Sequence, residues 1–212
     1  MNTIFDYLNA PMVQVWGVTM SAAEVFGFFS GVWCVWLTLH KNIWNFPIGI
    51  ANSALLGLLF FHSRLFADAG LQVMFIVLGL LGWYQWLQSK QVNSSHTVVV
   101  ITLNIRQKYL TALAIVINVL VLYFVLTWLK GSIPLFDASI TALSVVAQIL
   151  LNKRYLENWW VWIITDVISI PVYAYKGLWL VAALYIIFLI LAFIGLMVWR
   201  KAYQTHRIND VM

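Results

Sequence analysis

The chain has 212 residues, of which 63% are hydrophobic and only 9% are charged, and its mean hydropathy is +0.90. Soluble domains carry about 25% charged residues, so the composition excludes a water-soluble fold and predicts a polytopic membrane protein of one domain, residues 1–212. The net charge of +5 comes from bases spread over loops, which favours a topological role over nucleic-acid binding.

Seven apolar stretches are long enough to cross a hydrocarbon core of about 30 Å as helices, for which roughly 20 residues suffice. They are residues 20–39, 43–61, 65–88, 109–129, 133–151, 157–175 and 178–199. Their apolarity is continuous rather than alternating, which predicts helices and not the strands of a membrane barrel. Residues 1–19 are interrupted by Pro11 and Gly17 and are predicted to form a surface or re-entrant segment. The predicted fold class is an all-α membrane protein with seven transmembrane helices.

The basic residues lie outside these spans and gather at one end of them. Nine belong to the loops after the first, third and fifth spans and to the C-terminal tail: Lys41, Lys90, Arg106, Lys108, Lys153, Arg154, Arg200, Lys201 and Arg207. The loops at the other end hold Arg64, Lys130 and Lys176. Because cytoplasmic loops are enriched in Lys and Arg, we expect the C-terminus in the cytoplasm and the N-terminus outside. The first 19 residues contain no Lys or Arg, so no cleavable signal peptide is expected.

A shift of 113 residues aligns the first three spans with the last three without gaps. The matched pairs include Lys41/Arg154, Asn45/Asn158, Gly82/Gly195 and Trp86/Trp199. We interpret the match as a duplication, with repeat 1 at about 20–88, a linker helix at about 109–129 and repeat 2 at about 133–199. The extra crossing gives both triplets of helices the same orientation. Such a 3+1+3 parallel repeat is typical of transporters whose site lies near the midplane between the halves.

Acidic residues inside the spans are the first candidates for a site. Five of the seven acids fall there: Glu24, Asp68, Asp137, Glu157 and Asp166. Glu157 begins its span and can reach the cytoplasmic interface, whereas Asp166 is the tenth residue of the 19 in 157–175. Ionisable groups at such depth face a bundle interior or a wet cavity and are functional candidates. We therefore expect Asp166 to face a hydrated chamber between the two triplets.

The sixth span places Trp162, Asp166, Ser169 and Tyr173 on one stripe, because their spacings of 4, 3 and 4 residues follow the helical period. Aromatic rings above and below hydrogen-bonding groups suit a flat, polar heterocycle with an attached sugar. The alternative is that Asp166 forms a hydrogen bond within the bundle while the aromatic side chains simply pack.

Further polar side chains could complete the same site. Asn52 lies mid-span beside Ser53, the repeat partner of the sixth-span carboxylate, so a polar layer is expected at one depth in both halves. Gln72, its repeat partner Tyr185 and, nearer the cytoplasmic end, Gln148 are added to the candidates. Each amide could instead form a helix–helix hydrogen bond worth about 1 kcal/mol.

The remaining sequence features favour structural roles over catalysis. Trp86, Trp159, Trp160 and Trp199 lie near the predicted cytoplasmic boundary, where an aromatic belt is expected. The sequence contains no zinc-protease motif, phosphate-binding glycine loop, nucleophile elbow or His/Cys metal spacing, so we expect no catalytic residue, no metal and no cofactor. The polar stretch after the third span is predicted to be a linker between the halves.

The chain resembles the PnuC-type vitamin transporters in four stretches, NIWNFPIGIANSALLGLLFF, FADAGLQ, ENWWVWIITDVISIPVYAYKG and LYIIFLILAFIGLMVWRK. The resemblance implies a fold akin to the SWEET sugar transporters and a place in the bacterial cytoplasmic (inner) membrane. It implies uptake of nicotinamide riboside by facilitated diffusion, with a cytoplasmic kinase trapping the substrate without required contact. It also implies that the stripe on the sixth span lines the site.

The sequence leaves alternatives open. Many relatives have Asn where this chain has Asp166, and relatives carry thiamine or riboflavin. A carboxylate suits the pyridinium of nicotinamide riboside and cationic thiamine equally, whereas uncharged riboflavin gains least from it. A membrane-embedded enzyme or sensor using Asp166 and Glu24 would need a second catalytic group at the same depth, where only Asn, Ser and Thr occur. Proton coupling and a homo-oligomer are also compatible with the sequence.

Overall fold

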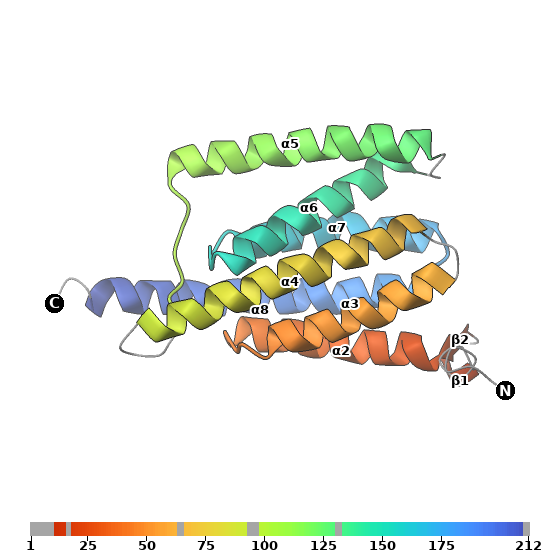
Figure 1. Ribbon diagram of the computed structural model, residues 1–212, viewed down its shortest axis with the longest axis horizontal. Coiled ribbons are helices and arrows are strands. Elements are labelled where there is room, and N and C mark those ends of the chain that lie inside the picture. The colour runs from red at the N-terminus through yellow and green to blue at the C-terminus, as the bar shows by residue number, and fades with distance from the viewer. Residues whose placement is uncertain (1–10, 16–17, 63–65, 93–97, 130–132, 210–212) are drawn as a thin grey trace.

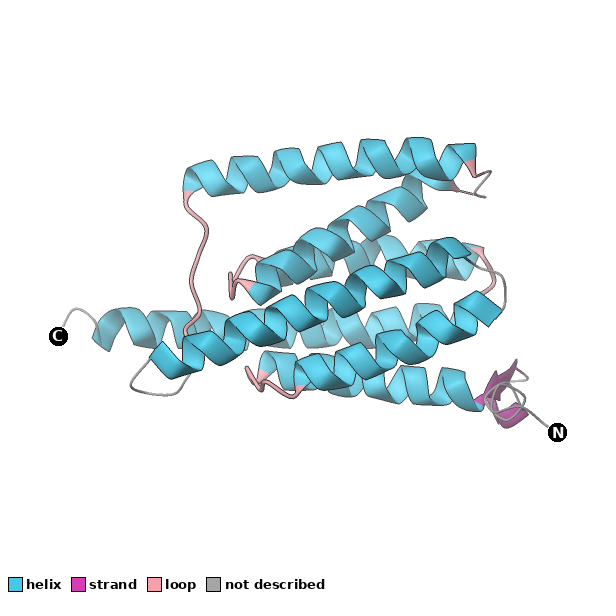
Figure 2. Ribbon diagram, viewed as in Figure 1, coloured by secondary structure: helices cyan, strands magenta, loops and turns pink. Residues whose placement is uncertain are grey.

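The computed structural model describes residues 11–15, 18–62, 66–92, 98–129 and 133–209, and seven helices make up most of them (Figures 1 and 2). The helices are α2 (Ala22–Leu39), α3 (Asn45–His62), α4 (Phe66–Val92), α5 (Ile105–Trp128), α6 (Pro134–Asn152), α7 (Asn158–Tyr175) and α8 (Trp179–Asn209). The seven predicted helices are confirmed. Apart from the groups at its two ends, a helix satisfies its backbone hydrogen bonds within itself, which lipid requires.

Two short strands precede the helices. The strands β1 (Pro11–Val15) and β2 (Val18–Ser21) form an antiparallel hairpin at the start of α2 (Figure 2). The all-α prediction did not include this hairpin. The remainder of the expected surface segment, residues 1–10 and 16–17, lies outside the described residues.

Most helix ends agree with the predicted spans to within two residues, and three differ by four residues or more. The α4 helix continues to Val92 rather than ending at 88. The α5 helix begins at Ile105 rather than 109 because Asn104 and Gln107 form a capping box: each backbone N–H donates to the other side chain, at 2.9 and 2.8 Å. The α8 helix continues to Asn209 rather than ending at 199, since its polar C-terminal residues still favour a helix beyond the apolar span.

Six of the described helices pack in a closed ring. Going around it, α2 contacts α3, α3 contacts α4, α4 contacts α6, α6 contacts α7, α7 contacts α8, and α8 returns to α2. The two triplets, α2–α4 and α6–α8, therefore meet twice, along α4/α6 and along α2/α8. The ring interior is the place where side chains from both triplets come together.

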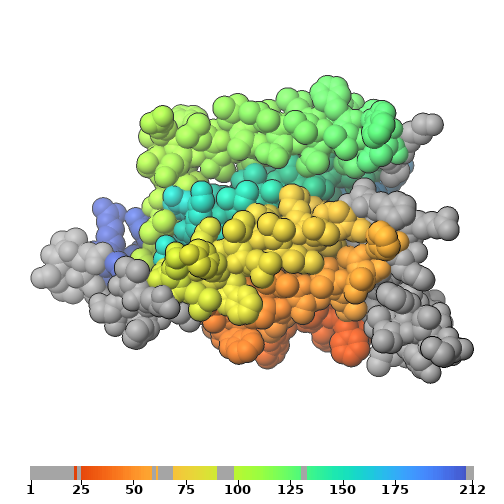
Figure 3. Space-filling view, in the orientation of Figure 1, coloured from red at the N-terminus to blue at the C-terminus, as the bar shows by residue number. Residues whose placement is uncertain are grey.

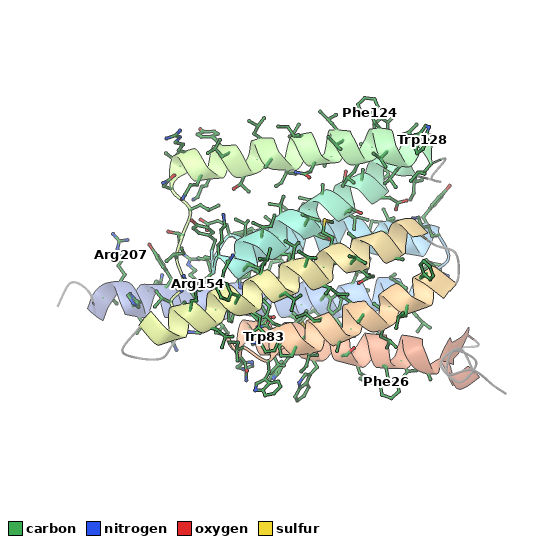
Figure 4. All side chains as sticks on the ribbon, in the orientation of Figure 1. Phe26, Trp83, Phe124, Trp128, Arg154 and Arg207 are labelled. Carbon is green, nitrogen blue, oxygen red and sulfur yellow. The ribbon has the colours of Figure 1, made fainter. Side chains whose placement is uncertain are left out.

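The α5 helix lies outside the ring and packs on α6 (Figures 1 and 3). None of its residues is buried, and Phe124 and Trp128 point away from the other helices (Figure 4). Four described helices, α4, α5, α6 and α8, are both long and apolar enough to span a membrane, and α2 contains a shorter apolar segment. An apolar helix without a protein partner on most of its surface is suited to contact with lipid.

The two triplets have matching local geometry at the offset of 113. Helix α3 (45–62) matches α7 (158–175) at both ends, and α4 and α8 begin at the matched positions 66 and 179. The turns after α2 and α6 each place a basic residue in the left-handed region, Lys41 with φ 57° and Arg154 with φ 63°. Burial lowers the pKa of both side chains. Lys41 and Arg154, which match at the offset of 113, therefore share the same left-handed backbone conformation.

The tryptophans at the end that carries the C-terminus also match. The indole N–H of Trp86 in α4 donates to the carbonyls of Leu151 and Asn152 at the end of α6, at 3.4 and 3.2 Å. The indole N–H of Trp199 in α8 donates to the carbonyls of Thr38 and Leu39 at the end of α2, at 3.3 and 3.2 Å. Each triplet therefore satisfies the open carbonyls at a helix end of the other.

Those tryptophans correct the predicted aromatic belt. Trp86, Trp159 and Trp199 are buried, and only Trp160 of the four is exposed. The Trp199 ring contacts Trp86 at 6.2 Å and Trp159 at 5.6 Å between centroids. They pack in the core rather than at the lipid surface because Trp86 and Trp199 bind the opposite triplet and Trp159 packs against Trp199 within its own.

The linker before α5 is docked on the second triplet. The backbone N–H of Ile101 donates to Arg154 O at 3.1 Å, and Leu156 N–H donates back to Ile101 O at 2.8 Å. The Leu103 N–H donates to both carboxylate oxygens of Glu157, each at 3.1 Å. Residues 98–103 of the predicted linker therefore pack against the folded core at this end, and Glu157 holds them there.

Candidate functional site

The α7 helix places two of its polar residues in the protein interior. Asp166 is 3% exposed and Ser169 is fully buried, whereas Trp162 and Tyr173 of the same stripe are half-buried. Ser169 Oγ donates to the carbonyl of Thr165 at 2.8 Å, so its hydrogen is used within the helix while its lone pairs remain available. The stripe expected from helical spacing thus has its carboxylate and hydroxyl in the buried region.

The α8 helix supplies the opposing side of this region. The rings of Tyr173 and Tyr185 stack with centroids 5.1 Å apart and an interplanar angle of 12°. Tyr185 also interacts with the side chains of Ser169 and Tyr173 and lies within electrostatic range of Asp166. Phe188 meets the edge of the Tyr185 ring at 5.9 Å. Four predicted residues, Asp166, Ser169, Tyr173 and Tyr185, are therefore brought together, and we call them the Asp166 cluster.

Asn52 of α3 adjoins the Asp166 cluster through Phe188. A Cβ added at Gly31 of α2 would lie 3.3 Å from Phe188 Cζ and 3.6 Å from Asn52 Nδ2, so both side chains pack over this glycine. Within the described part of the chain, Asn52 Oδ1 is buried without a hydrogen-bond partner. A buried acceptor without a partner costs roughly 1–3 kcal/mol, which a bound donor would recover.

Three predicted residues make their described contacts with other parts of the protein. Gln72 packs against Gly57 of α3, where an added Cβ would lie 3.2 Å from Gln72 Cβ. Gln148 donates to Asn152 Oδ1 at 3.0 Å, and Asn152 donates in turn to Leu78 O of α4 at 2.7 Å. Gln148 thus takes part in a polar contact between α6 and α4.

Trp162, the third of them, packs against two buried hydrophobic clusters, one that spans both triplets around Trp159 and Trp199 and another around Leu143 and Val146. Sequence reasoning missed the tryptophan contacts between triplets, although the Trp86/Trp199 match at the offset of 113 was a signal for them.

Two surface pockets lie at the end that carries the C-terminus. One of 240 Å³ lies between α4 and α6 and includes Gln85 and Lys153; the other, of 290 Å³, lies between the linker and α8 and includes His206 and Arg207. Neither contains Asp166, which is enclosed by protein in this conformation. The hydrated chamber stays a prediction.

The ring of two matching triplets, with a buried polar cluster between apolar helices, defines a multi-pass membrane transporter. Residues 21–201 match the family model described as nicotinamide mononucleotide transporter, and the chain belongs to this family.

Relatives of known name agree with this membership. The chain is 30% identical to the nicotinamide riboside transporter PnuC of Escherichia coli (strain K12), over 86% of this chain and 87% of the relative. It is 23% identical to the riboflavin/roseoflavin transporter RibM of Streptomyces davaonensis, over 81% and 84%. A crystal structure of the vitamin B3 transporter PnuC superimposes with a TM-score of 0.71 at 23% identity, covering 87% of this chain and 82% of that one. The structural match supports the fold.

Proposed function

We propose that this protein takes up nicotinamide riboside across the bacterial cytoplasmic membrane by facilitated diffusion, through a site between the two triplets. The observation that carries the proposal is the Asp166 cluster, in which a buried carboxylate and a hydroxyl lie beside two stacked tyrosine rings. The pyridinium of nicotinamide riboside is a flat cation and its ribose carries hydroxyls. A carboxylate and aromatic faces are the groups that bind such a ligand.

Each candidate residue has a proposed role. Asp166 opposes the pyridinium charge, Tyr173 and Tyr185 offer aromatic faces, and Asn52 Oδ1 accepts from a carboxamide or ribose donor. Trp162, Ser169, Gln72 and Gln148 complete the proposed set of substrate-binding residues. Substrate entry would need the Tyr173–Tyr185 stack to open, because the two rings cover each other in this conformation.

We also propose that the triplets are copies of one three-helix unit, in an arrangement akin to the SWEET transporters. The matched helix ends, the paired left-handed turns and the reciprocal indole bonds support this duplication. The end with the buried tryptophans would be the cytoplasmic gate, closed in this conformation. A cytoplasmic kinase would trap the substrate by phosphorylation, without contact between the proteins.

Equilibrium binding tests the substrate. Calorimetry on purified protein should show binding of nicotinamide riboside that is weakened in Asp166→Asn, because the neutral amide lacks the charge attraction. Riboflavin is the second candidate, favoured by the similarity to RibM, and thiamine is the third. Binding of riboflavin or thiamine, with none of nicotinamide riboside, would overturn the first choice.

Transport tests the mechanism. Proteoliposomes without ion gradients should accumulate unmodified radiolabelled nicotinamide riboside up to the external concentration. Uptake that requires a proton gradient would replace facilitated diffusion by proton coupling. Recovery of a chemically altered label would instead support the enzyme alternative.

A further inference from the structure

An ion pair lies at the end of the bundle opposite the C-terminus. Lys176, the residue after α7, donates from Nζ to Asp137 Oδ1 in the first turn of α6 at 2.7 Å. The two side chains are 25% and 29% exposed, so the pair is partly shielded from solvent. Among the described residues the other ion pair, Lys108 with Glu157, is longer at 3.6 Å and has a more exposed lysine.

The same lysine contacts the Asp166 cluster through the ring of Tyr173. Its Nζ lies 5.8 Å from the centroid of the Tyr173 ring, in cation–π range. Tyr173 in turn stacks on Tyr185, which interacts with Ser169. An unbroken series of contacts therefore runs from the Asp137–Lys176 pair to the candidate site.

The exact sequence position of this charge is not repeated in the first triplet, although a base, Arg64, occurs one residue further along. The sequence position that matches Lys176 is Ser63, which carries no charge and lies outside the described residues. An unpaired ammonium beside the stacked rings of Tyr173 and Tyr185 would repel a cationic substrate, and low-dielectric surroundings strengthen that repulsion. Asp137 supplies an opposite charge in direct contact with it.

We propose that Asp137 and Lys176 set the charge selectivity of the site: Lys176 positions the Tyr173 ring, and Asp137 neutralises Lys176 so that a cationic ligand can reach it. The inference rests on the proposed function, since it specifies the ligand class as a flat organic cation. Both are positioning residues that act through Tyr173.

Two probes separate charge from shape. Nicotinamide riboside carries a pyridinium cation, and its 1,4-dihydro form has the same carboxamide and ribose without the charge. The measured quantity is the ratio of the KM for the cation to the KM for the neutral form, from initial uptake into proteoliposomes. A folding defect lowers the amount of active transporter and so reduces Vmax for both probes, whereas a charge effect changes the ratio of their KM values.

Asp137→Asn should raise this ratio roughly tenfold, the scale of one unpaired charge acting through partly screened surroundings. Lys176→Gln should lower the ratio, because it leaves the Asp137 carboxylate unpaired, and an unpaired negative charge attracts the cationic probe. The double variant Asp137→Asn/Lys176→Gln should return the ratio to within about twofold of wild type. Lys153→Gln, which removes an exposed charge at the other end of the bundle, is the matched control and should leave the ratio unchanged.

A ratio that stays at the wild-type value in both single variants, or that moves in the same direction in both, overturns the inference while wild-type uptake upholds the proposed function. If folded wild-type protein takes up neither probe, both the inference and the proposed function are overturned. If one single variant does not fold, the direction of change in the other decides.

Discussion

Single glycines allow close helix contacts within each triplet and, at Gly82, also between the two triplets. A Cβ at Gly82 of α4 would collide with Asn152 Oδ1 and Phe46, and a Cβ at Gly195 of α8 would lie 2.5 Å from Trp159 Cη2. Positions 46 and 159 are themselves matched at the offset of 113. A glycine at the matched position therefore faces an aromatic residue at the matched position in both triplets.

Gly82→Ala and Gly195→Ala are therefore expected to destabilise the protein by about 1–3 kcal/mol each, the usual cost of overpacking a core. Thermal unfolding in detergent measures the effect. Gly70→Ala is the control, because an added Cβ there meets nothing within 4 Å. Equal stability of all three variants would contradict the close contacts.

Trp162→Ala tests the aromatic part of the proposed site. Binding of nicotinamide riboside should weaken by roughly 1–3 kcal/mol, the value of one stacking platform for a base. Calorimetry on folded protein measures the change. The neighbouring Trp160, 53% exposed, provides the control substitution Trp160→Ala, which should leave affinity unchanged. Unaltered affinity in folded Trp162→Ala would remove this residue from the site.

At the scale of helices, the contacts between triplets are reciprocal. Trp86 of α4 holds the end of α6, and Trp199 of α8 holds the end of α2. Each bond should be worth about 1 kcal/mol, as for hydrogen bonds between membrane helices. Together they fix the end that we propose as the cytoplasmic gate.

Replacement of either indole should loosen the helix end of the opposite triplet. Trp86→Phe should raise amide hydrogen exchange in residues 149–153, and Trp199→Phe should raise it in residues 36–40, each about fivefold for a loss of about 1 kcal/mol. Mass spectrometry of exchanged peptides measures both. Faster exchange only within the helix that carries the substitution would argue against the reciprocal contact.

The docked linker depends on Glu157. In Glu157→Gln only one side-chain oxygen remains to accept from Leu103 N–H, and the charge is lost, at a cost of roughly 1–3 kcal/mol. Limited proteolysis should then cut within residues 98–103 faster than in wild type. Lys108→Gln is the control: its 3.6 Å pair is more than half exposed on the lysine side and should contribute little. Unchanged cleavage of Glu157→Gln would show that other contacts hold the linker.

Local apolarity predicts the helices, whereas burial depends on partners that a single sequence does not reveal. All seven spans were found because lipid requires long, continuous apolar runs. Trp86 and Trp199 were assigned to the lipid surface, since a tryptophan near a helix end suits either a membrane interface or a contact with another helix. Stripe spacing places Asp166, Ser169 and Tyr173 on one face of α7, and the first two are buried there. No local pattern showed that Gln148 contacts α4 through Asn152.

At the scale of the whole molecule, the loops divide between two ends. The α2–α3 and α6–α7 turns and the last turn of α8 lie at one end, and the end of α3, the start of α4 and the α7–α8 turn lie at the other (Figure 1). The basic residues Lys41, Lys153 and Arg154 belong to the first end. We therefore infer that this end is cytoplasmic.

Labelling from outside tests this orientation. In a Cys34→Ser background, Tyr175→Cys should react with an impermeant maleimide in intact cells, because Tyr175 is 82% exposed at the end opposite the C-terminus. Thr205→Cys in the exposed C-terminal part of α8 should react only after the membrane is permeabilised. The reverse pattern would invert the assignment.

The helix that belongs to neither triplet has a topological consequence. Three crossings are an odd number, so without α5 the second triplet would enter the bilayer upside down relative to the first. Trp86 and the end of α6 would then lie in opposite leaflets, and the reciprocal indole bonds could not form. The α5 helix contacts α6 and otherwise presents its side chains outward. Its main role is therefore to add one more crossing of the membrane. An apolar spacer helix with few sequence requirements thus allows two matching three-helix units of one chain to close into a ring.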